Sequence, residues 1–357
     1  MRILCLIESL IPGGAERQMT GLASLLKKEG HEVAVWTYYP QDFYKGQLDE
    51  AGVEYRCIIK AKSKLRRIPV LLKEARKWKP DVMISYLPTG TMVACVMKML
   101  GLKTKLIVSE RNTSQQYGLK EKIRFYLFKK EADWVVPNSY TQKRFILSHY
   151  PSLIKKVRVI TNFVDTGYFS PATETDQNDK TLRMICVGRL VPQKNVLRFI
   201  DVVTRLKWKG IQLKIDWFGR TDGDYAEQCI EKIKQEDLSD VIEFRGVSSD
   251  IRDEYRKADV FCMPSLWEGF PNVLCEAMSC GLPVLCSKVC DNAEIVKDGE
   301  NGFLFDPLSI NDMTNTITRF VMSDDKTRLE MADKSREMAL ETFSADVFVK
   351  RYMEVIS

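Results

Sequence analysis

Two glutamates eight residues apart, Glu268 and Glu276, stand in a segment suited to bind a polyhydroxyl ligand. The segment follows an apolar run at Val260–Met263, which is typical of a buried strand. Pro271 suits the start of a helix and Gly281 suits its end. We therefore predict Glu268 on the loop after the strand and Glu276 inside the helix. Each carboxylate can there accept hydrogen bonds from neighbouring hydroxyl groups.

A glycine and two cations follow another apolar run. The segment VGRLVPQKN places Gly188, Arg189 and Lys194 directly after Met184–Val187. A diphosphate needs such groups, because arginine offers a planar fork of donors and lysine a compact charge. The alternative is a pair of solvated surface cations. No Asp-x-Asp motif lies nearby to hold Mg²⁺, so we expect the cations to neutralise a diphosphate without a metal.

The first half of the chain has a glycine turn of its own. The apolar run Ile3–Ile7 leads into the loop SLIPGGAE, where Gly13 and Gly14 precede a helix predicted over Ala15–Lys28. Glycines let a ligand approach the backbone, and a helix N-terminus offers free N–H groups to an anion. The loop does not match G-x-G-x-x-G, and a lone Gly-Gly pair is more often only a turn.

Short apolar runs alternate with helical patterns along the chain. Strands that are apolar throughout and separated by helices indicate parallel sheets covered on both faces. We predict an α/β fold of two doubly wound, Rossmann-like domains that face each other across a cleft, with ligands at the carboxyl ends of the strands. The predicted strands are Ile3–Ile7, Val33–Thr37, Tyr55–Ile59, Val82–Tyr86, Leu106–Ser109, Trp134–Pro137, Val157–Thr161, Met184–Val187, Leu213–Phe218, Val241–Phe244, Val260–Met263 and Pro283–Cys286.

The alternation pauses in a turn-rich stretch with the composition of a linker. We expect residues 1–165 to form the first domain, 166–180 the linker, 181–340 the second domain, and 341–357 a C-terminal helix that returns to the first domain. Charge also divides the chain: residues 1–170 hold 29 Lys/Arg and 15 Asp/Glu, and the remaining residues hold 25 and 33. A basic first half and an acidic second half predict different partners.

The composition argues against several other classes of protein. No apolar run approaches the roughly 20 residues of a spanning helix, and the start of the chain lacks the pattern of a signal peptide. The ten cysteines include no C-x-x-C pair and match no zinc motif. We therefore expect reduced thiols in a cytoplasmic protein without a metal site.

Five ordered motifs resemble those of retaining glycosyltransferases of the GT-B fold, specifically glycosyltransferase family 4 (glycosyl transferases group 1). The resemblance covers nearly the whole chain. The motifs are the glycine loop Gly13–Glu16, Asn162 in ITNFVD, the G-R-x₄-K segment of Gly188, Arg189 and Lys194, the E-x₇-E motif of Glu268 and Glu276, and the segment AEIVKDGENGFL that begins at Ala293.

The resemblance implies a role for each matching residue. Arg189 and Lys194 would neutralise the donor diphosphate and the leaving charge. Glu268 would hold the transferred sugar and complete the catalytic set, and Glu276 would hold the ribose. The other implied donor-binding residues are Gly13 and Gly14, which approach as the cleft closes, Gly188, then Gly219, Arg220, Gly246 and Val247 around the nucleobase, and Gly269, Phe270, Asn272, Val273 and Leu274 through backbone N–H groups.

One departure from the family concerns a histidine near the sugar. Many relatives place one after the strand that corresponds to Leu106–Ser109, whereas here both histidines lie elsewhere. The resemblance implies front-face substitution, in which the leaving phosphate accepts the proton of the acceptor, and this mechanism needs no histidine. We expect three residues to contact the acceptor, namely Glu16, Glu110 and Arg111.

Two basic segments in the first half interleave cations with apolar side chains. Lys60–Lys79 holds nine cations and one acid, and Leu119–Lys130 holds five cations among its aromatic residues. Such segments can lie on anionic bilayers, and ordinary solvated helices are the alternative. No nucleic-acid-binding motif accompanies the charge, so we expect no nucleic-acid partner. We expect this domain to lie on the inner face of the cytoplasmic membrane and to receive a glycan or polyprenyl-linked acceptor.

Together these features predict a metal-independent, retaining hexosyl- or N-acetylhexosaminyltransferase that uses no cofactor. It would move a sugar from a nucleotide-diphosphate donor, with a UDP-sugar favoured, in polysaccharide or cell-surface glycan biosynthesis. A sugar-nucleotide epimerase or hydrolase of the same fold is one alternative, but Glu268 and Glu276 look committed to hydroxyl groups. A non-catalytic nucleotide-sugar-binding protein is the other, and the presence of Arg189 and Lys194 argues against it.

Overall fold

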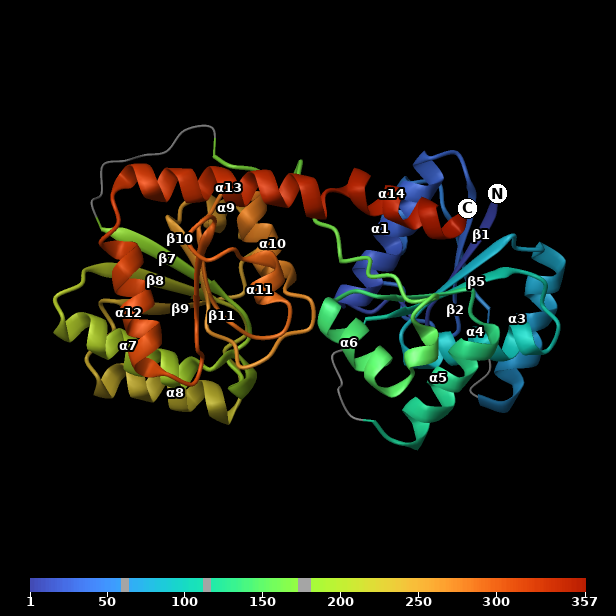
Figure 1. Ribbon diagram of the computed structural model, residues 1–357, viewed down its shortest axis with the longest axis horizontal. Helices are drawn as coiled ribbons and strands as arrows, with labels where there is room; N and C mark the ends of the chain where they lie inside the picture. The colour runs from blue at the N-terminus through green and yellow to red at the C-terminus, as the bar shows by residue number, and fades with distance from the viewer. Residues whose placement is uncertain (59–63, 112–116, 173–180) are drawn as a thin grey trace. The chain divides into compact units, whose positions relative to one another are not determined.

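The computed structural model describes residues 1–58, 64–111, 117–172 and 181–357. It divides into two compact units (Figure 1). Unit 1 comprises Met1–Phe163 and Ala345–Ser357, and unit 2 comprises Val164–Ser344. Residues 166–172 of the predicted linker belong to unit 2, and its residues 173–180 lie outside the described part of the chain.

Unit 1 contains a parallel six-stranded sheet in the order β3-β2-β1-β4-β5-β6. Its central strands are buried on both faces, as expected where helices cover both sides of a sheet. The strands are β1 (Arg2–Leu6), β2 (Glu32–Thr37), β3 (Glu54–Cys57), β4 (Val82–Tyr86), β5 (Lys105–Glu110) and β6 (Trp134–Pro137).

Helices cover both faces of this sheet (Figure 1). One face packs on α1 and α14, and the other on α3, α4 and α5. The predicted helix Ala15–Lys28 is confirmed, with Met19, Leu22 and Leu26 buried on one side. The helices are α1 (Gly14–Lys28), α2 (Lys45–Glu50), α3 (Lys64–Trp78), α4 (Pro88–Met99), α5 (Leu119–Glu131), α6 (Tyr140–His149), the short η1 (Pro151–Leu153) and α14 (Ala345–Ile356).

The predicted strand Val157–Thr161 is wrong. Val157 makes a single parallel bridge with Val135, and the segment continues without regular structure. Val157 and Ile160 are nevertheless buried, because the extended chain runs along the edge strand β6, where Arg158 N donates to Val135 O at 3.0 Å. The apolar residues of this segment therefore indicate that the chain is buried at the sheet edge, although it does not form a further strand.

Unit 2 repeats the architecture with the strand order β12-β11-β10-β7-β8-β9. Strand β12 is absent from the predicted set, because its four residues, GFLF, begin with a glycine directly after the turn-rich sequence DGEN. The strands are β7 (Leu182–Val187), β8 (Leu213–Phe218), β9 (Ile242–Gly246), β10 (Val260–Met263), β11 (Val284–Ser287) and β12 (Gly302–Phe305).

The helices of unit 2 also pack on both sheet faces. Helices α7, α8 and α12 share one core, and α10 and α13 share the other. The helices are the short η2 (Pro192–Lys194), α7 (Val196–Trp208), α8 (Asp224–Gln235), α9 (Ile251–Arg256), α10 (Asn272–Ser279), α11 (Asn292–Ile295), α12 (Ile310–Val321) and α13 (Asp325–Phe343).

Each sheet reverses its direction of winding at one place. In unit 1 the chain proceeds outward from β1 to β3 and then resumes at β4 on the other side of β1. In unit 2 the equivalent neighbours are β7 and β10. Because connections leave such a point in opposite directions, a crevice opens at the carboxyl ends of the two strands, and ligands of doubly wound folds bind there.

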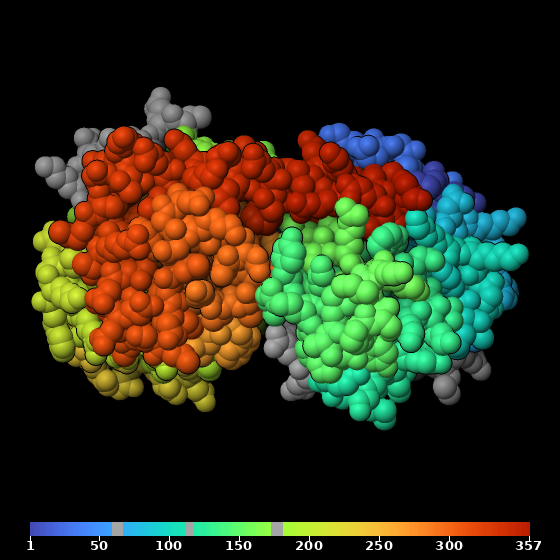
Figure 2. Space-filling model, in the orientation of Figure 1, coloured from blue at the N-terminus to red at the C-terminus, as the bar shows by residue number. Residues whose placement is uncertain are grey.

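The last two helices belong to different units. Helix α13 lies beside α10, where Ala339 and Phe343 enter the core of unit 2, and Figure 2 shows its outer side at the molecular surface. After Ser344 the chain continues as α14, whose Phe348 and Tyr352 are buried in unit 1. The C-terminal helix thus returns to the first unit, as predicted.

Phe348→Ala is expected to destabilise unit 1 by about 3–5 kcal/mol, because it removes a buried ring from a packed core. The Phe348 ring centroid lies 4.8 Å from that of Phe163 and 5.0 Å from that of Tyr352. Thermal or urea unfolding measures the loss. Lys350→Ala, at an exposed position of the same helix, is the matched control and should change the free energy of unfolding by less than about 0.5 kcal/mol. Equal effects of the two substitutions would contradict the docking of α14.

Candidate functional site

A lysine and a glutamate meet at the switch point of unit 2. Lys194 belongs to the segment after β7, and Glu268 to the loop after the neighbouring strand β10. Lys194 Nζ lies 2.5 Å from Glu268 Oε1, and the two side chains are 15% and 10% exposed. A largely buried charge pair at the edge where doubly wound folds bind ligands is the candidate site.

Two glycines create the room that Lys194 occupies. A Cβ added to Gly188 would lie 2.8 Å from Cε of Lys194, so the lysine stem lies against the bare backbone. A Cβ on Gly219, after β8, would lie 2.1 Å from the carbonyl oxygen of Gly188. That same oxygen accepts a hydrogen bond from Trp217 Nε1 at 2.8 Å. The end of β8 therefore lies so close to the backbone of Gly188 that position 219 has no room for a Cβ, while Gly188 leaves room for the lysine stem.

The second glutamate lies where the sequence predicts. Pro271 is the N-cap of α10, Glu276 lies inside the helix and is 5% exposed, and Gly281 follows the helix with a φ of +80°. Glu268 lies on the preceding loop. The predicted arrangement of one carboxylate on the loop and one on the helix is confirmed, while their roles toward a ligand stay predictions.

The start of α10 offers fewer free N–H groups than predicted. Asn272 N donates to Phe270 O at 3.0 Å, and Leu274 N donates to Pro271 O at 3.1 Å. The side chains of Phe270 and Leu274 also enter the hydrophobic core. A tight turn before the helix satisfies these amides internally, a feature that residue types alone do not reveal.

Asn195 is a positioning residue that the sequence analysis missed. It adopts a left-handed conformation with a φ of +59°, which asparagine tolerates better than most residues. Its Nδ2 donates to Pro264 O at 3.1 Å and to Pro307 O at 2.8 Å. One buried side chain thus ties together the loops that follow β7, β10 and β12. One indication of this role lies in the sequence, because Asn195 directly follows Lys194, which is predicted to bind the ligand.

Gln193 and Cys290 hold the loop that carries Glu268. Gln193 O accepts from Leu266 N at 2.8 Å, and Gln193 Nε2 donates to Trp267 O at 2.8 Å. Glu268 N itself donates to Cys290 Sγ at 3.5 Å. These contacts fix the loop backbone on both sides of the glutamate, which limits the positions that its carboxylate can reach.

The other donor-binding residues predicted in unit 2 lie at the same edge of its sheet. Arg189 and Arg220 are exposed, and Val247 is 72% exposed. Gly219 N donates to Gly246 O at 2.7 Å, so the ends of β8 and β9 are joined. Exposed side chains here leave the edge accessible, as a nucleobase contact requires.

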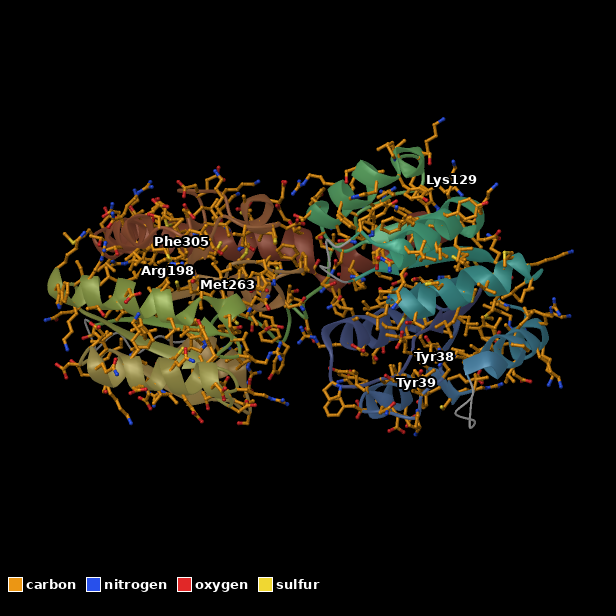
Figure 3. The ribbon with its side chains drawn as sticks, turned by 90° about the horizontal axis from the view of Figure 1, so that it is seen from below. Tyr38, Tyr39, Lys129, Arg198, Met263 and Phe305 are labelled. Atoms are coloured by element: carbon orange, nitrogen blue, oxygen red, sulfur yellow. The ribbon has the colours of Figure 1, made fainter. Side chains whose placement is uncertain are left out.

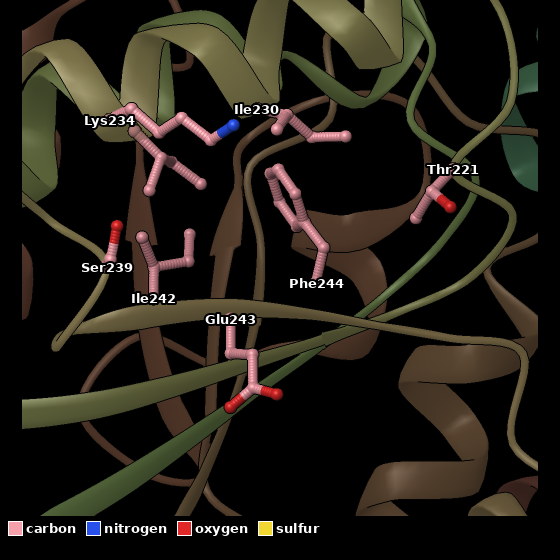
Figure 4. A pocket seen from close by; sticks show the side chains of 8 residues that line it. Thr221, Ile230, Lys234, Ser239, Ile242, Glu243 and Phe244 are labelled. Carbon is pink, nitrogen blue, oxygen red and sulfur yellow. The ribbon is translucent and has the colours of Figure 1, made fainter.

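A separate apolar pocket of about 310 Å³ lies between α8 and the edge strand β9 (Figure 4). Ile230 and Phe244 point toward each other across it, and Lys234 lies near its rim. None of its lining residues is a predicted site residue. They are Thr221, Ile230, Ile233, Lys234, Ser239, Ile242, Glu243 and Phe244.

In unit 1 the glycine loop is covered by a carboxylate. A Cβ on Gly13 would lie 2.2 Å from Oε2 of Glu16, so the glutamate folds back over the start of α1. Burial raises the pKa of the Glu16 carboxyl and neighbouring Glu8 adds to the rise, while a backbone N–H opposes it. The Glu16 carboxyl therefore already lies at the N-terminus of α1. The approach of a donor to Gly13 and Gly14 stays a prediction.

Glu110, at the end of β5, has an internal partner. Its side chain is almost fully buried, and its Oε2 accepts from Arg124 Nη2 at 3.1 Å. Burial raises the pKa of the Glu110 carboxyl, and the arginine partly lowers it again. The predicted contact with an acceptor stays a prediction. The structure adds a buried ion pair that the sequence did not indicate.

Arg111 lies at the centre of a buried polar cluster. It donates to Asn162 Oδ1 at 2.5 Å, to Tyr86 Oη at 2.9 Å, to Tyr352 Oη at 2.6 Å and to Ser109 Oγ at 2.9 Å. Because Tyr352 belongs to α14, this arginine fastens the C-terminal helix to the sheet of unit 1. Arg111 therefore has a structural role, and its predicted acceptor contact stays a prediction.

The thiols and the remaining metal ligands are dispersed. None of the ten cysteines, all within the described residues, forms a disulfide, and burial raises the pKa of Cys5 and Cys95 to about 12. Within the described ranges, no three His, Cys, Asp or Glu side chains form a group that could hold a metal ion. No helix among those residues is long and apolar enough to cross a membrane.

Two doubly wound α/β units in one chain are the architecture of the GT-B fold. The model named Glycosyltransferase Family 4 matches residues 12–168, and the model named Glycosyl transferases group 1 matches residues 172–338. The two matches together span nearly the whole chain. The chain belongs to this family of glycosyltransferases.

Several known proteins are similar to the chain. A Campylobacter jejuni enzyme named GalNAc-α-(1→4)-GalNAc-α-(1→3)-diNAcBac-PP-undecaprenol α-1,4-N-acetyl-D-galactosaminyltransferase is 29% identical over 85% of this chain and 84% of its own length. An Escherichia coli UDP-Gal:α-D-GlcNAc-diphosphoundecaprenol α-1,3-galactosyltransferase is 30% identical over 53% of this chain and 51% of its own. The crystal structure of Anabaena HepE in complex with UDP shares the fold, with a TM-score of 0.88, 20% identity, and coverage of 100% and 99%.

Gly219→Ala is expected to destabilise unit 2 by about 3 kcal/mol or more, because the new Cβ meets the backbone of Gly188 and cannot be accommodated by a side-chain rotation. Gly210→Ala is the matched control: its φ is also positive, +73°, but no atom lies within 4 Å of the added Cβ. The control should cost only the roughly 1–2 kcal/mol of a left-handed alanine. Thermal unfolding distinguishes the two, and similar losses would contradict the close approach of β7 and β8.

Proposed function

We propose that the chain transfers a sugar from a nucleotide-diphosphate donor, preferably a UDP-sugar, to a lipid-linked saccharide during biosynthesis of a cell-surface glycan. The contact between Lys194 and Glu268 at the switch point of unit 2 carries the proposal. The reaction retains the configuration of the sugar and uses no metal. The enzyme works at the inner face of the cytoplasmic membrane.

The donor is assigned from the chemistry of the groups at this edge. Arg189 and Lys194 bind the diphosphate, Glu276 accepts from the ribose hydroxyls, and Glu268 accepts from the sugar hydroxyls. In the free protein Lys194 and Glu268 neutralise each other. When the diphosphate takes the lysine, the glutamate becomes available to the sugar. The E. coli relative is named for a UDP-galactose donor, which supports uridine as the base.

The transfer step balances without a protein base. The bond from C1 of the sugar to the β-phosphate oxygen breaks, and the acceptor oxygen bonds to C1 on the same face. An oxygen of the departing β-phosphate takes the proton of the acceptor hydroxyl, so the products are the glycosylated acceptor and the nucleoside diphosphate. Arg189 and Lys194 stabilise the charge that develops on the leaving diphosphate.

The acceptor is assigned from the relatives. The C. jejuni and E. coli enzymes are both named for saccharides linked through a diphosphate to undecaprenol. Two transferred sugars appear in these names, N-acetylgalactosamine and galactose, so a hexose or an N-acetylhexosamine is proposed for this chain.

UDP is expected to raise the melting temperature of the protein more than GDP or ADP, because a ligand that binds only the folded state stabilises it. Lys194→Met should weaken UDP binding about 10- to 100-fold, since a charge-assisted hydrogen bond contributes about 1.5–3 kcal/mol. Calorimetric titration measures the affinity. Lys326→Met, on an exposed lysine of α13, is the control and should bind UDP normally. Unchanged affinity in Lys194→Met would remove the lysine from the donor site.

Turnover tests the reaction itself. The protein is incubated with UDP-N-acetylgalactosamine or UDP-galactose and a polyprenyl-diphosphate-linked N-acetylhexosamine, and the products are identified by mass spectrometry and NMR. Transfer with retained anomeric configuration, undiminished by EDTA, supports the proposal. Hydrolysis or epimerisation of the donor without an acceptor would contradict it.

Helix α5 supports the membrane part of the proposal. Leu119, Ile123 and Tyr126 are 73%, 46% and 52% exposed at successive turns of this helix. Four lysines on the helix are also exposed: Lys120, Lys122, Lys129 and Lys130. Apolar side chains beside cations suit the boundary of an anionic bilayer. Lys60–Ser63 of the other basic segment lie outside the described residues.

Lys120→Glu with Lys129→Glu should lower binding to vesicles at least about tenfold, because each cation near an anionic surface contributes roughly 1 kcal/mol. Co-sedimentation with phosphatidylcholine vesicles that contain about one third phosphatidylglycerol measures the binding. The control replaces two exposed lysines of unit 2, Lys209→Glu with Lys326→Glu, and keeps the same net charge. Equal loss in both variants would show a net-charge effect and contradict a role for α5.

A further inference from the structure

We propose that the pocket between α8 and β9 in unit 2 binds a small amphipathic carboxylate, a molecule with an apolar body and one anionic head. The pocket has a volume of about 310 Å³, at the lower end of the range for ligand sites. At roughly 30 Å³ for each group the size of a water molecule, it holds about ten such groups, as many as octanoate has non-hydrogen atoms. The site goes beyond the proposed transfer reaction, to which none of its residues is assigned.

The pocket arises at the open edge of the unit 2 sheet. Strand β9 is the last strand in the sheet, and α8 is the outermost helix on its face, because α7 lies between α8 and α12 (Figure 3). Ile233 and Ile242 line the buried part of the pocket and are 6% and 2% exposed. At the opening, Ile230 of α8 and Phe244 of β9 are only half-buried and point toward each other (Figure 4).

This apolar lining is held open in the folded protein. Protein cores are normally close-packed, and apolar surface that stays in water forgoes the free energy of burial. The ring of Phe244 packs edge-to-face on Trp217, with the ring centroids 6.4 Å apart, so this wall of the pocket is fixed. A pre-formed apolar cavity with a few polar groups at its rim is the usual form of a small-molecule site.

Lys234 supplies a cation at the rim. It lies one turn after Ile230 on α8, so the two side chains are neighbours, and its ammonium group lies beside the opening (Figure 4). Lys232, on the same helix, pairs with Asp201 at 2.5 Å. Lys234, by contrast, forms no ion pair with any residue that the structure describes. A carboxylate can bind this ammonium group while its apolar chain enters the pocket.

The one acid in the pocket lining does not compete for this lysine. Side chains alternate between the two faces of a strand, and the Glu243 carboxylate points away from the pocket (Figure 4). Its Oε1 accepts a hydrogen bond from Arg245 Nη1 at 2.7 Å. The remaining polar residues of the lining, Thr221 and Ser239, are neutral. The charge facing the pocket is therefore positive, which favours an anionic ligand over a neutral or cationic one.

The pocket is separate from the predicted donor site. It lies along β9 and extends to Ser239, ahead of the strand, whereas the donor residues lie at the carboxyl ends of the strands. Neither Lys194 nor Glu268 lines it. Thr221 directly follows Arg220, so the two sites are neighbours at one end. We therefore expect the carboxylate and a nucleotide to bind at the same time.

Octanoate is the probe, and saturation-transfer NMR on the full-length protein measures its binding at millimolar concentration. Ile230→Trp fills the cavity, so it should weaken octanoate binding at least about tenfold while the melting temperature stays or rises. Lys234→Met removes the cation but keeps an apolar stem, and it should weaken binding about two- to fivefold, as expected for an exposed ion pair. Lys209→Met, at an exposed position of unit 2 outside the pocket, should leave binding unchanged.

Four outcomes would overturn the site. Octanoate would fail to bind the wild type, or would bind Ile230→Trp or Lys234→Met as tightly as the wild type. Saturating UDP would displace octanoate, which would place the carboxylate in the donor site. Light scattering would show a dimer that Ile230→Trp converts to a monomer, so that a second copy fills the pocket. Octanoate binding that depends on Ile230 and Lys234 supports the site even if UDP does not bind, so the test is independent of the proposed donor.

Discussion

The ion pair of Lys194 and Glu268 is the interaction around which unit 2 is arranged. Two charges taken out of water cost several kcal/mol each, and apolar residues of similar volume usually give equal or greater stability. The pair is therefore poorly explained by folding alone. The bare backbone of Gly188 admits the lysine stem, Gly219 lets the strand ends close up, and Asn195 joins the surrounding loops. These features fix where the two charges lie when a ligand arrives.

The same topology serves two different ends in the two units. Both sheets have one switch point, but unit 2 leaves exposed side chains such as Arg189 and Val247 at its edge. In unit 1, by contrast, Arg111 is buried at this edge and donates a hydrogen bond to Tyr352 of α14. The C-terminal helix is anchored there by a buried guanidinium with four hydrogen-bonded partners, so that cation is a structural element of unit 1.

Much of the fold could be predicted from the sequence because strands buried on both faces of a parallel sheet are apolar throughout. The position of Pro271 between Glu268 and Glu276 also predicted that the first glutamate lies on a loop and the second in a helix. The failures have physical causes. Val157–Thr161 has the pattern of a strand because a chain along a sheet edge buries apolar residues such as Val157 and Ile160. Strand β12 begins with Gly302 directly after a turn, which hides its apolar residues in a turn-like stretch. The partner of Glu110 is Arg124, from the next helix along the chain, and no short-range pattern encodes this contact.

The contrast between Arg67 and Arg111 shows what the structure adds to a motif. Both arginines are buried at the carboxyl edge of one sheet, and both lie against tyrosine rings. Arg111 makes four hydrogen bonds to its neighbours, which hold it within the core of unit 1. Arg67 donates to Tyr39 Oη at 2.7 Å, and its guanidinium lies over the rings of Tyr38 and Tyr39. The hydrogen-bonded partners of a buried arginine, which no sequence motif contains, therefore decide whether it fastens one element to another.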